Sequence, residues 1–269
     1  MAEPKLTYGL DENGTLIHID DAIRGKGCNC VCPDPQCKAK LVAKQGAKNK
    51  WHFAHDNGAD CAGARMTALH MLAQQIIQEE KKIRTPRYED AYYTKESEII
   101  TFDEVLVEQH IKTSEIDRRP DCVGVLNGTS LWIEIKVTHE VDEVKQCDII
   151  KENICCMEVD LSDLVEIDYT REQVRMRLFS PSEYRCCRWI NNPELLRKSQ
   201  EERQKRIEKE NKQSETSQRI QEYIDKKHAE EEALKRSQQI IEKPKDDFAD
   251  EYNVPSYDEW INFCESFRK

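Results

Sequence analysis

The sequence predicts a mixed α/β protein in three parts: a small β-rich module at the N-terminus, a central α/β core and a long C-terminal helix. Five of the 12 cysteines lie within the first 63 residues. Residues 64–192 combine a helical apolar pattern with strand-like alternation. Residues 193–243 hold no glycine, and proline occurs only at their first position, which is typical of one uninterrupted helix. The expected domains are therefore residues 1–63, 64–192 and 193–243, followed by a linker and a short amphipathic helix in residues 244–269.

Composition and charge exclude several classes of protein. The 269 residues carry a formal net charge of -11, which excludes a uniformly basic nucleic-acid coat but leaves room for local basic patches. No apolar run approaches the ~20 residues of a membrane-spanning helix. The opening residues MAEPKLTYGL lack the apolar stretch of a secretory signal. We therefore expect no membrane contact and a reducing, cytoplasmic location, in which the cysteines are free or bind metal.

The N-terminal module carries residues that ligate metals. Residues 5–19 predict a hairpin around the turn DENG, and a lysine-rich strand pair is expected around Gly46. Seven cysteines and histidines fall within residues 28–61 in separated clusters, which suits a structural, tetrahedral zinc site. The preferred ligands are Cys32, Cys37, His55 and Cys61; His52 is the alternative to His55, and Cys28 and Cys30 are spare candidates. The competing interpretation is a set of buried cysteines beside a hydrogen-bonded histidine.

The same module has a basic hairpin. Between Cys37 and Asp56, all the charged side chains are lysines: Lys38, Lys40, Lys44, Lys48 and Lys50. These lysines, with Arg118 and Arg119 further along the chain, are candidates for contact with nucleic-acid phosphates. The alternative is a solvated charged face.

The central core is expected to have the element order α-β-β-β-α-β. The pattern predicts a helix over 64–82, a strand near 103–111 and then a hairpin. A second helix near 141–152 and the strand ICCMEVDL complete the order.

The hairpin brings three charged residues together. Its two-residue turn is the dipeptide Asn-Gly at 127–128. The register set by this turn places Asp121 opposite Glu134, and Lys136 shares their face because strand side chains alternate. Two opposed carboxylates repel, but Mg²⁺ or Mn²⁺ between them removes that objection. The lysine would then stand where a phosphate gathers negative charge. The alternative is an ordinary charged strand end.

This element order, with Pro120-Asp121 and Glu134-Ile135-Lys136 as its motif, resembles the core of the PD-(D/E)xK nuclease superfamily. Residues 8 to about 192 more specifically resemble the nucleases similar to the competence protein CoiA. The matching pieces are the early hairpin, Cys32 and Cys37, the run HFAH, Cys61, Leu69-His70, Arg119-Pro120-Asp121, IEIKVTH, Lys145, MEVDLS and WINN.

The resemblance implies a metal-dependent nuclease that hydrolyses DNA phosphodiester bonds with water activated by Mg²⁺ or Mn²⁺. It assigns Asp121, Glu134 and the backbone carbonyl of Ile135 to this metal, and Lys136 to activation of the water and stabilisation of the transition state. It assigns the N-terminal cysteines and histidines to zinc. Two positions depart from the family pattern: Met66 replaces a glutamate and Gln74 replaces a lysine. The alternative function is therefore a non-catalytic nucleic-acid-binding or scaffolding subunit with a degenerate nuclease core.

The C-terminal part is expected to be a charged helical arm. Apolar residues in the stretch typified by EERQKRIEKENKQ are too sparse for a strict heptad seam, so a solvated arm is favoured over a weak coiled coil. In the tail, Ser256 and Glu259 form a capping-box pattern. Apolar residues then recur at helical spacing: Tyr257, Trp260, Ile261, Cys264 and Phe267. We expect a protein partner or self-association through residues 194–269, in a larger nucleic-acid-processing or defence assembly.

Overall fold

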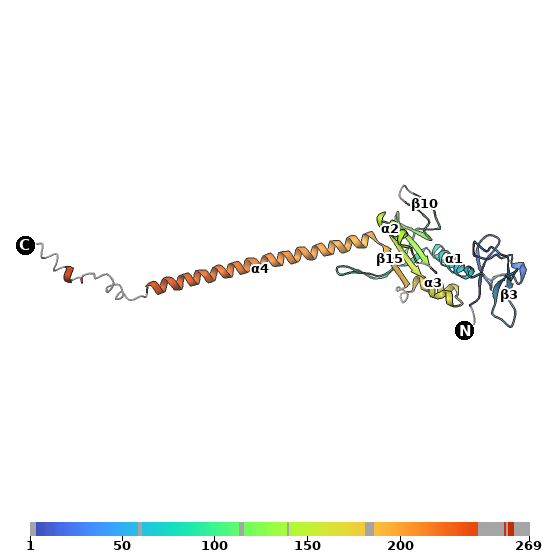
Figure 1. Ribbon diagram of the computed structural model, residues 1–269, viewed down its shortest axis with the longest axis horizontal. Helices are drawn as coiled ribbons and strands as arrows, with labels where there is room; N and C mark the ends of the chain where they lie inside the picture. Colours follow the sequence, from blue (N-terminus) through green and yellow to red (C-terminus); the bar gives the residue numbers. More distant parts are fainter. Residues whose placement is uncertain are drawn as a thin grey trace, which may run out of the picture. The chain divides into compact units, whose positions relative to one another are not determined.

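The computed structural model describes residues 4–58, 61–112, 116–138, 140–180, 186–241, 256 and 258–260. The chain divides into two units, Met1–Arg203 and Gln204–Lys269. The first unit contains the cysteine-rich module and the α/β core, and the second consists mainly of one long helix (Figure 1).

The N-terminal module is built from two small hairpins. Strands β1 (Tyr8–Leu10) and β2 (Leu16–His18) pair antiparallel, as do β3 (Leu41–Lys44) and β4 (His52–His55). The short 3-10 helix η1 (Lys26–Cys28) lies between the hairpins in sequence. Val31 bridges the two by pairing with Leu10 on one side and Lys40 on the other. Both predicted hairpins are confirmed.

The core is a five-stranded sheet with strand order β15-β14-β13-β12-β9. Its strands are β9 (Glu104–Val107), β12 (Cys122–Leu126), β13 (Thr129–Lys136), β14 (Cys156–Asp160) and β15 (Cys187–Asn191). Strands β13 and β14 are parallel and are joined by α2 (Glu143–Lys151), whereas the other neighbours are antiparallel. Together with α1 (Gly63–Glu80), the main elements follow the predicted order α-β-β-β-α-β.

The central hairpin has the register expected from its turn. Asn127 and Gly128 both have positive φ, 50° and 76°, which a type I′ turn requires. Leu126 therefore pairs with Thr129, and the ladder continues to Cys122 opposite Ile133. Asp121 follows directly beyond this ladder, so the prediction that it stands opposite Glu134 agrees with the observed register.

The two faces of the sheet have separate hydrophobic clusters. On one face, Ile133 and Ile135 of β13 pack in the main core, to which α1 contributes Leu69, Leu72 and Ile76. On the other face, a smaller cluster contains Trp132, Ile149 of α2 and Ile190. Because side chains alternate along β13, Glu134 shares the face of Trp132, which is the face that α2 covers.

One predicted strand is present but shorter than expected. The strand expected near 103–111 ends at Val107, because Glu108 adopts left-handed φ of 47°. The chain then forms β10 (Ile111–Lys112), which pairs with β11 (Asp117–Arg118) in a separate ribbon.

Several further elements were not assigned from the sequence. They are the pair β5 (Lys82–Arg84) and β8 (Ile99–Thr101), the pair β6 (Tyr88–Glu89) and β7 (Thr94–Lys95), η2 (Ser162–Glu166) and α3 (Arg171–Phe179).

Helix α4 (Pro193–Ile241) begins in the first unit and continues through most of the second. Leu195 and Ser199 near its start are buried, whereas every side chain from 204 to 237 is exposed. This exposure agrees with the favoured interpretation of a solvated arm. No described helix has an apolar segment long enough to span a bilayer.

The predicted capping box in the tail is confirmed. The backbone N–H of Ser256 donates to Glu259 Oε2 at 2.8 Å, and the N–H of Glu259 donates to Ser256 Oγ at 3.3 Å. Of the predicted apolar face, Trp260 is exposed. Its other members, Tyr257, Ile261, Cys264 and Phe267, lie outside the described residues.

Candidate functional site

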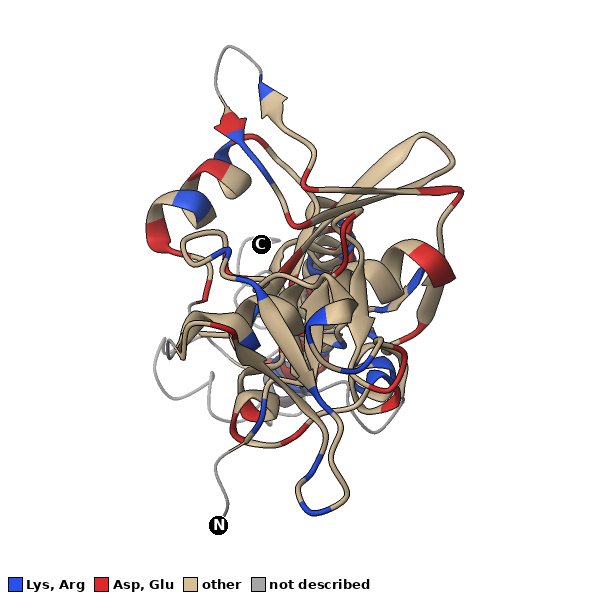
Figure 2. Cartoon of the chain, turned by 90° about the vertical axis from the view of Figure 1, so that its right-hand side faces the viewer, with Lys and Arg blue, Asp and Glu red and all other residues tan. Residues whose placement is uncertain are grey.

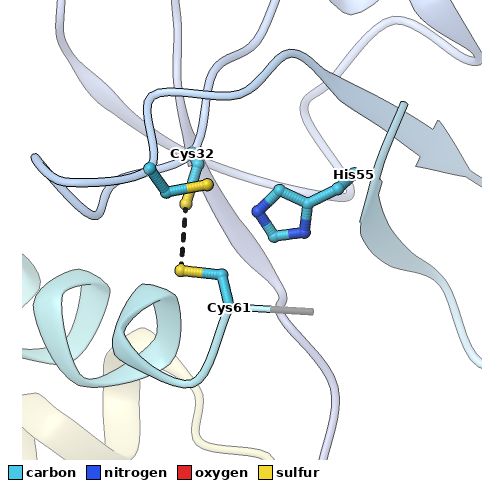
Figure 3. A group of neighbouring side chains, drawn as sticks. Cys32, His55 and Cys61 are labelled. Atoms are coloured by element: carbon cyan, nitrogen blue, oxygen red, sulfur yellow. Dashed lines mark hydrogen bonds between the residues drawn. The ribbon is translucent and has the colours of Figure 1, made fainter. Parts of the chain in front are cut away.

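Four side chains from separate segments of the N-terminal module converge on one point. Cys32 and Cys37 flank the loop PDPQ, His55 ends β4, and Cys61 precedes α1. One potential ligand atom from each residue lies within 4.8 Å of the corresponding atoms of the other three. Figure 3 shows His55 and Cys61 directed toward Cys32. Within the described part of the chain, this is the only group of three or more such residues that meets this criterion.

The donor set fits a zinc ion. The Cys32 and Cys61 sulfurs are 3.9 Å apart, close to the ~3.8 Å that two thiolates 2.3 Å from a tetrahedral zinc would span. His55 Nε2 is buried and has no hydrogen-bond partner among the described residues. Burial raises the pKa of the Cys32 thiol to about 12, so its thiolate needs a nearby cation. The preferred ligand set is thus confirmed as a cluster that could bind a metal such as zinc.

The other candidate ligands lie apart from this cluster. His52 Nδ1 is 2.8 Å from the backbone carbonyl of Lys50. The Cys28 thiol faces the carbonyl of Leu41, and the Cys30 thiol faces that of Cys28. His52, Cys28 and Cys30 therefore have backbone partners of their own.

A second group of charged side chains lies at the end of the central hairpin. Asp121 Oδ2 accepts a hydrogen bond from the backbone N–H of Ile135 at 2.7 Å. In an extended strand the N–H and C=O of one residue point to the same side, so the Ile135 carbonyl also faces the end of β12. Asp121, Glu134, Ile135 and Lys136 line one hollow of about 230 Å³.

Glu134 is held in an unusual environment for a carboxylate. Its side chain is buried, and Oε2 accepts from Lys145 Nζ of α2 at 2.6 Å. Oε1 is buried and has no hydrogen-bond partner among the described residues. Burial, reinforced by the charge of Asp121 and opposed by Lys145, raises the pKa of Glu134 to about 7. A cation beside Oε1 would satisfy this atom and reverse the shift.

Two side chains of α1, His70 and Gln74, also contact Asp121. His70 Nε2 lies 3.0 Å from Asp121 Oδ2. Burial alone would lower the pKa of His70, but the hydrogen bond to Asp121 outweighs it and the pKa is raised. Gln74 donates to the backbone carbonyl of Asp121 at 3.2 Å and to Glu108 Oε1 at 3.3 Å. The departure at position 74 thus retains a polar group that fixes the backbone of Asp121, while Met66 packs against the main core.

Lys136, which was expected on the face of Asp121 and Glu134, makes its ion pair with a third carboxylate. Its Nζ pairs with Asp160 Oδ2 at 2.9 Å on the neighbouring parallel strand. The ammonium group on Glu134 is that of Lys145 instead. Lys136 nevertheless lines the hollow, so its charge stands beside the two carboxylates.

Sequence reasoning missed the role of Glu158, which extends the site across the sheet. Glu158 lies beside Glu134 in the parallel ladder and opposite Arg188 in the antiparallel one. Its two oxygens accept from Arg188 Nε at 2.8 Å and from the backbone N–H of Val141 at 2.7 Å. A glutamate within the otherwise apolar run CCMEV was the available signal.

The proposed basic contacts are mostly accessible. Lys38, Lys40, Lys44, Lys48, Lys50 and Arg119 are exposed, although Lys50 pairs with Asp168 at 2.8 Å. Arg118 Nε donates to Asp148 at 3.0 Å. In the view of Figure 2, basic and acidic positions are interspersed. Contact with nucleic acid stays a prediction for all these residues.

Comparison with known proteins finds one similarity, which lies within the N-terminal module. Residues 20–64 match the family described as "Competence protein CoiA, N-terminal domain". No curated protein and no solved structure matches the chain. The matched range contains the Cys/His cluster and ends before the acidic hollow.

Proposed function

From the match of residues 20–64 to the CoiA N-terminal domain, we propose that this chain is a metal-dependent nuclease that hydrolyses DNA phosphodiester bonds. The observation that carries the proposal is the hollow at the end of the central hairpin. There, two opposed carboxylates, Asp121 and Glu134, lie beside the ammonium group of Lys136. A sheet gains no stability from opposed carboxylates, so their placement favours a cation-binding role.

Asp121, Glu134 and the backbone carbonyl of Ile135 would hold Mg²⁺ or Mn²⁺. Glu134 Oε1, which is buried without a hydrogen-bond partner among the described residues, is the observation that supports the fit. When bound, the cation supplies Lewis acidity that activates water and offsets charge on the phosphate. His70 orients Asp121, and Gln74 fixes its backbone. Lys136, positioned by Asp160, stabilises negative charge as it develops on the phosphate.

Zinc has a different role in this proposal. Four protein ligands leave no open coordination position, so the Cys/His cluster is structural. It ties the small hairpins to the start of α1, the helix that carries His70 and Gln74. The exposed lysines of the β3–β4 hairpin would contact the DNA backbone.

A cleavage assay tests this function. Linear duplex, circular duplex and single-stranded DNA would be incubated with EDTA, Mg²⁺ or Mn²⁺. We expect metal-dependent cutting by the wild type and by the matched control Glu143→Gln, which changes an exposed carboxylate on α2. Asp121→Asn and Lys136→Ala should lose cutting while they keep the wild-type unfolding temperature and zinc content. Cutting by folded Asp121→Asn at the wild-type rate would show that the activity belongs elsewhere.

One observation favours a second candidate, a non-catalytic nucleic-acid-binding subunit. Beside Asp121, α1 presents His70 and Gln74, and Met66 occupies the position at which the family resemblance implies a glutamate. Helix α1 therefore contributes a histidine, and no carboxylate, to the described lining of the hollow. This candidate predicts DNA binding that weakens as salt rises, with no product under any divalent metal.

A further inference from the structure

A second cavity adjoins the acidic hollow. It is a groove of about 570 Å³ between the N-terminal module and α1. Its wall is largely apolar and includes Val31, Pro33, Pro35 and Met71. Thr67, Lys38, Glu108 and His70 add polar groups to the lining. The volume lies within the usual range of small-ligand sites.

The groove and the acidic hollow share one wall. His70 lines both the groove and the acidic hollow, and its Nε2 lies 3.0 Å from Asp121 Oδ2. A strand whose phosphate lies at Asp121 and Glu134 would therefore bring a neighbouring nucleotide to the mouth of the groove. Lys38 stands exposed at this mouth and can meet the next phosphate.

The side chains that line the groove suit the base of a nucleotide. Prolines, Val31 and the thioether of Met71 offer an apolar surface to the flat face of a base. Glu108 offers carboxylate oxygens, which accept from the exocyclic amines of cytosine, adenine and guanine. A base inside a duplex has both faces stacked and its pairing edge in use, so it cannot enter a groove of this kind.

We propose that the groove holds an unpaired nucleobase next to the phosphodiester at the acidic site. The substrate is then DNA with a single-stranded segment, such as an overhang, rather than blunt duplex. This inference rests on the proposed function for the position of the phosphate, but it makes a separate prediction about binding.

Binding without cleavage tests the groove. Full-length, zinc-loaded protein would be titrated without added Mg²⁺ or Mn²⁺ and without chelator, against a fluorescent duplex with a single-stranded overhang and against the same duplex with blunt ends. We expect the overhang to bind about tenfold more tightly, the size of effect that one sequestered base supplies. Thr67→Phe fills the groove and should remove this preference. Gln78→Phe, at an exposed position of the same helix outside the groove, should keep it.

A second pair of variants covers the case in which Thr67→Phe fails to fold. Lys38→Glu places an anion at the mouth and should reduce the preference, whereas Arg24→Glu also introduces a glutamate at an exposed basic position of the same module, outside the groove, and should not. Equal binding of the two DNAs by wild type, no binding of either, or the same preference in Thr67→Phe and Gln78→Phe would overturn the inference. Because cleavage is not measured, an inactive wild type that retains the groove-dependent preference would reject the nuclease and keep the groove.

Discussion

Lys145 of α2 and Glu134 of β13 form a partly buried ion pair, with Nζ 2.6 Å from Oε2. The pair joins a helix and a strand that are separated by the loop leading into α2. Among the described contacts, Lys145 is the cation that pairs with Glu134, whereas Glu158, the other buried carboxylate of the hollow, pairs with Arg188. Lys145 therefore offsets the negative charge of Glu134 before any metal binds.

Replacing Lys145 alone should lower the free energy of unfolding more than replacing Lys145 and Glu134 together. Lys145→Met leaves a buried carboxylate without its partner, and we expect the free energy of unfolding to fall by about 3 kcal/mol. The double variant Lys145→Met with Glu134→Gln should recover much of this loss. Urea unfolding of the four proteins in the cycle measures the coupling. Lys48→Met in an exposed loop is the control. Additive effects of the two substitutions would show that the pair does not couple.

Metal content should distinguish the two histidines of β4. His55→Ala and Cys61→Ser should lose zinc, measured as bound metal per chain after extensive dialysis, and should unfold at lower temperature because structural zinc contributes folding energy. His52→Ala is the matched control on the same strand and should keep both properties, since its ring faces the Lys50 carbonyl. Full zinc content in Cys61→Ser would contradict the assigned ligand set.

The hydrogen bonds of Asp168 should make the folding stability of the protein fall in acid. It accepts from the backbone N–H of Lys5 at 2.6 Å and from Lys50 Nζ at 2.8 Å, and so ties the N-terminal module to the segment before α3. Burial alone would raise the pKa of Asp168, but these partners outweigh it and hold the pKa below its usual range. The stabilisation is present above the unfolded pKa near ~4 and is lost as pH falls through the lower folded value.

Asp168→Asn should therefore lower the free energy of unfolding by about 1–2 kcal/mol at pH 7. The difference from wild type should shrink below pH ~4 and disappear once Asp168 is protonated. Urea unfolding between pH 3 and pH 7 measures this, with the exposed Glu12→Gln as control. A difference that stays constant across the range would mean that charge at Asp168 is not the cause.

Local signals predicted much of the candidate site. Asn127-Gly128 fixed the hairpin register, because its turn geometry leaves one pairing. The metal-binding set followed from ligand chemistry and from strand alternation, which separates His52 from His55.

Pairings between distant segments could not be predicted in this way. The Lys136–Asp160 and Glu158–Arg188 pairs depend on how β14 aligns with its two neighbours, which no turn specifies. The early end of β9 depends on the left-handed backbone conformation of Glu108, which could not be predicted from the sequence. Two-residue strands such as β10 and β11 are too short for any periodic pattern to reveal.

Glu158 should fix the position of the segment that leads into α2, the helix that carries Lys145. Its carboxylate is almost fully buried, and it holds Val141 N–H on one oxygen and Arg188 on the other. Val141 stands just before the N-cap of α2, Asp142, whose side chain accepts from the backbone N–H of Lys145. Glu158→Gln keeps the shape of the side chain, but one end of the amide donates where the carboxylate accepted, so one buried donor loses its partner.

We expect Glu158→Gln to cost about 1–3 kcal/mol of unfolding free energy. It should also speed amide hydrogen exchange at the start of α2, because the segment is then tied to the sheet at fewer points. Mass spectrometry of peptides that cover residues 140–151 measures the exchange, and Glu143→Gln, an exposed carboxylate in the first turn of the same helix, is the matched control. Exchange that rises equally in both variants would assign the effect to the helix terminus. Exchange that rises only in Glu158→Gln would show that a side chain two strands away from Asp121 sets the position of Lys145 on Glu134.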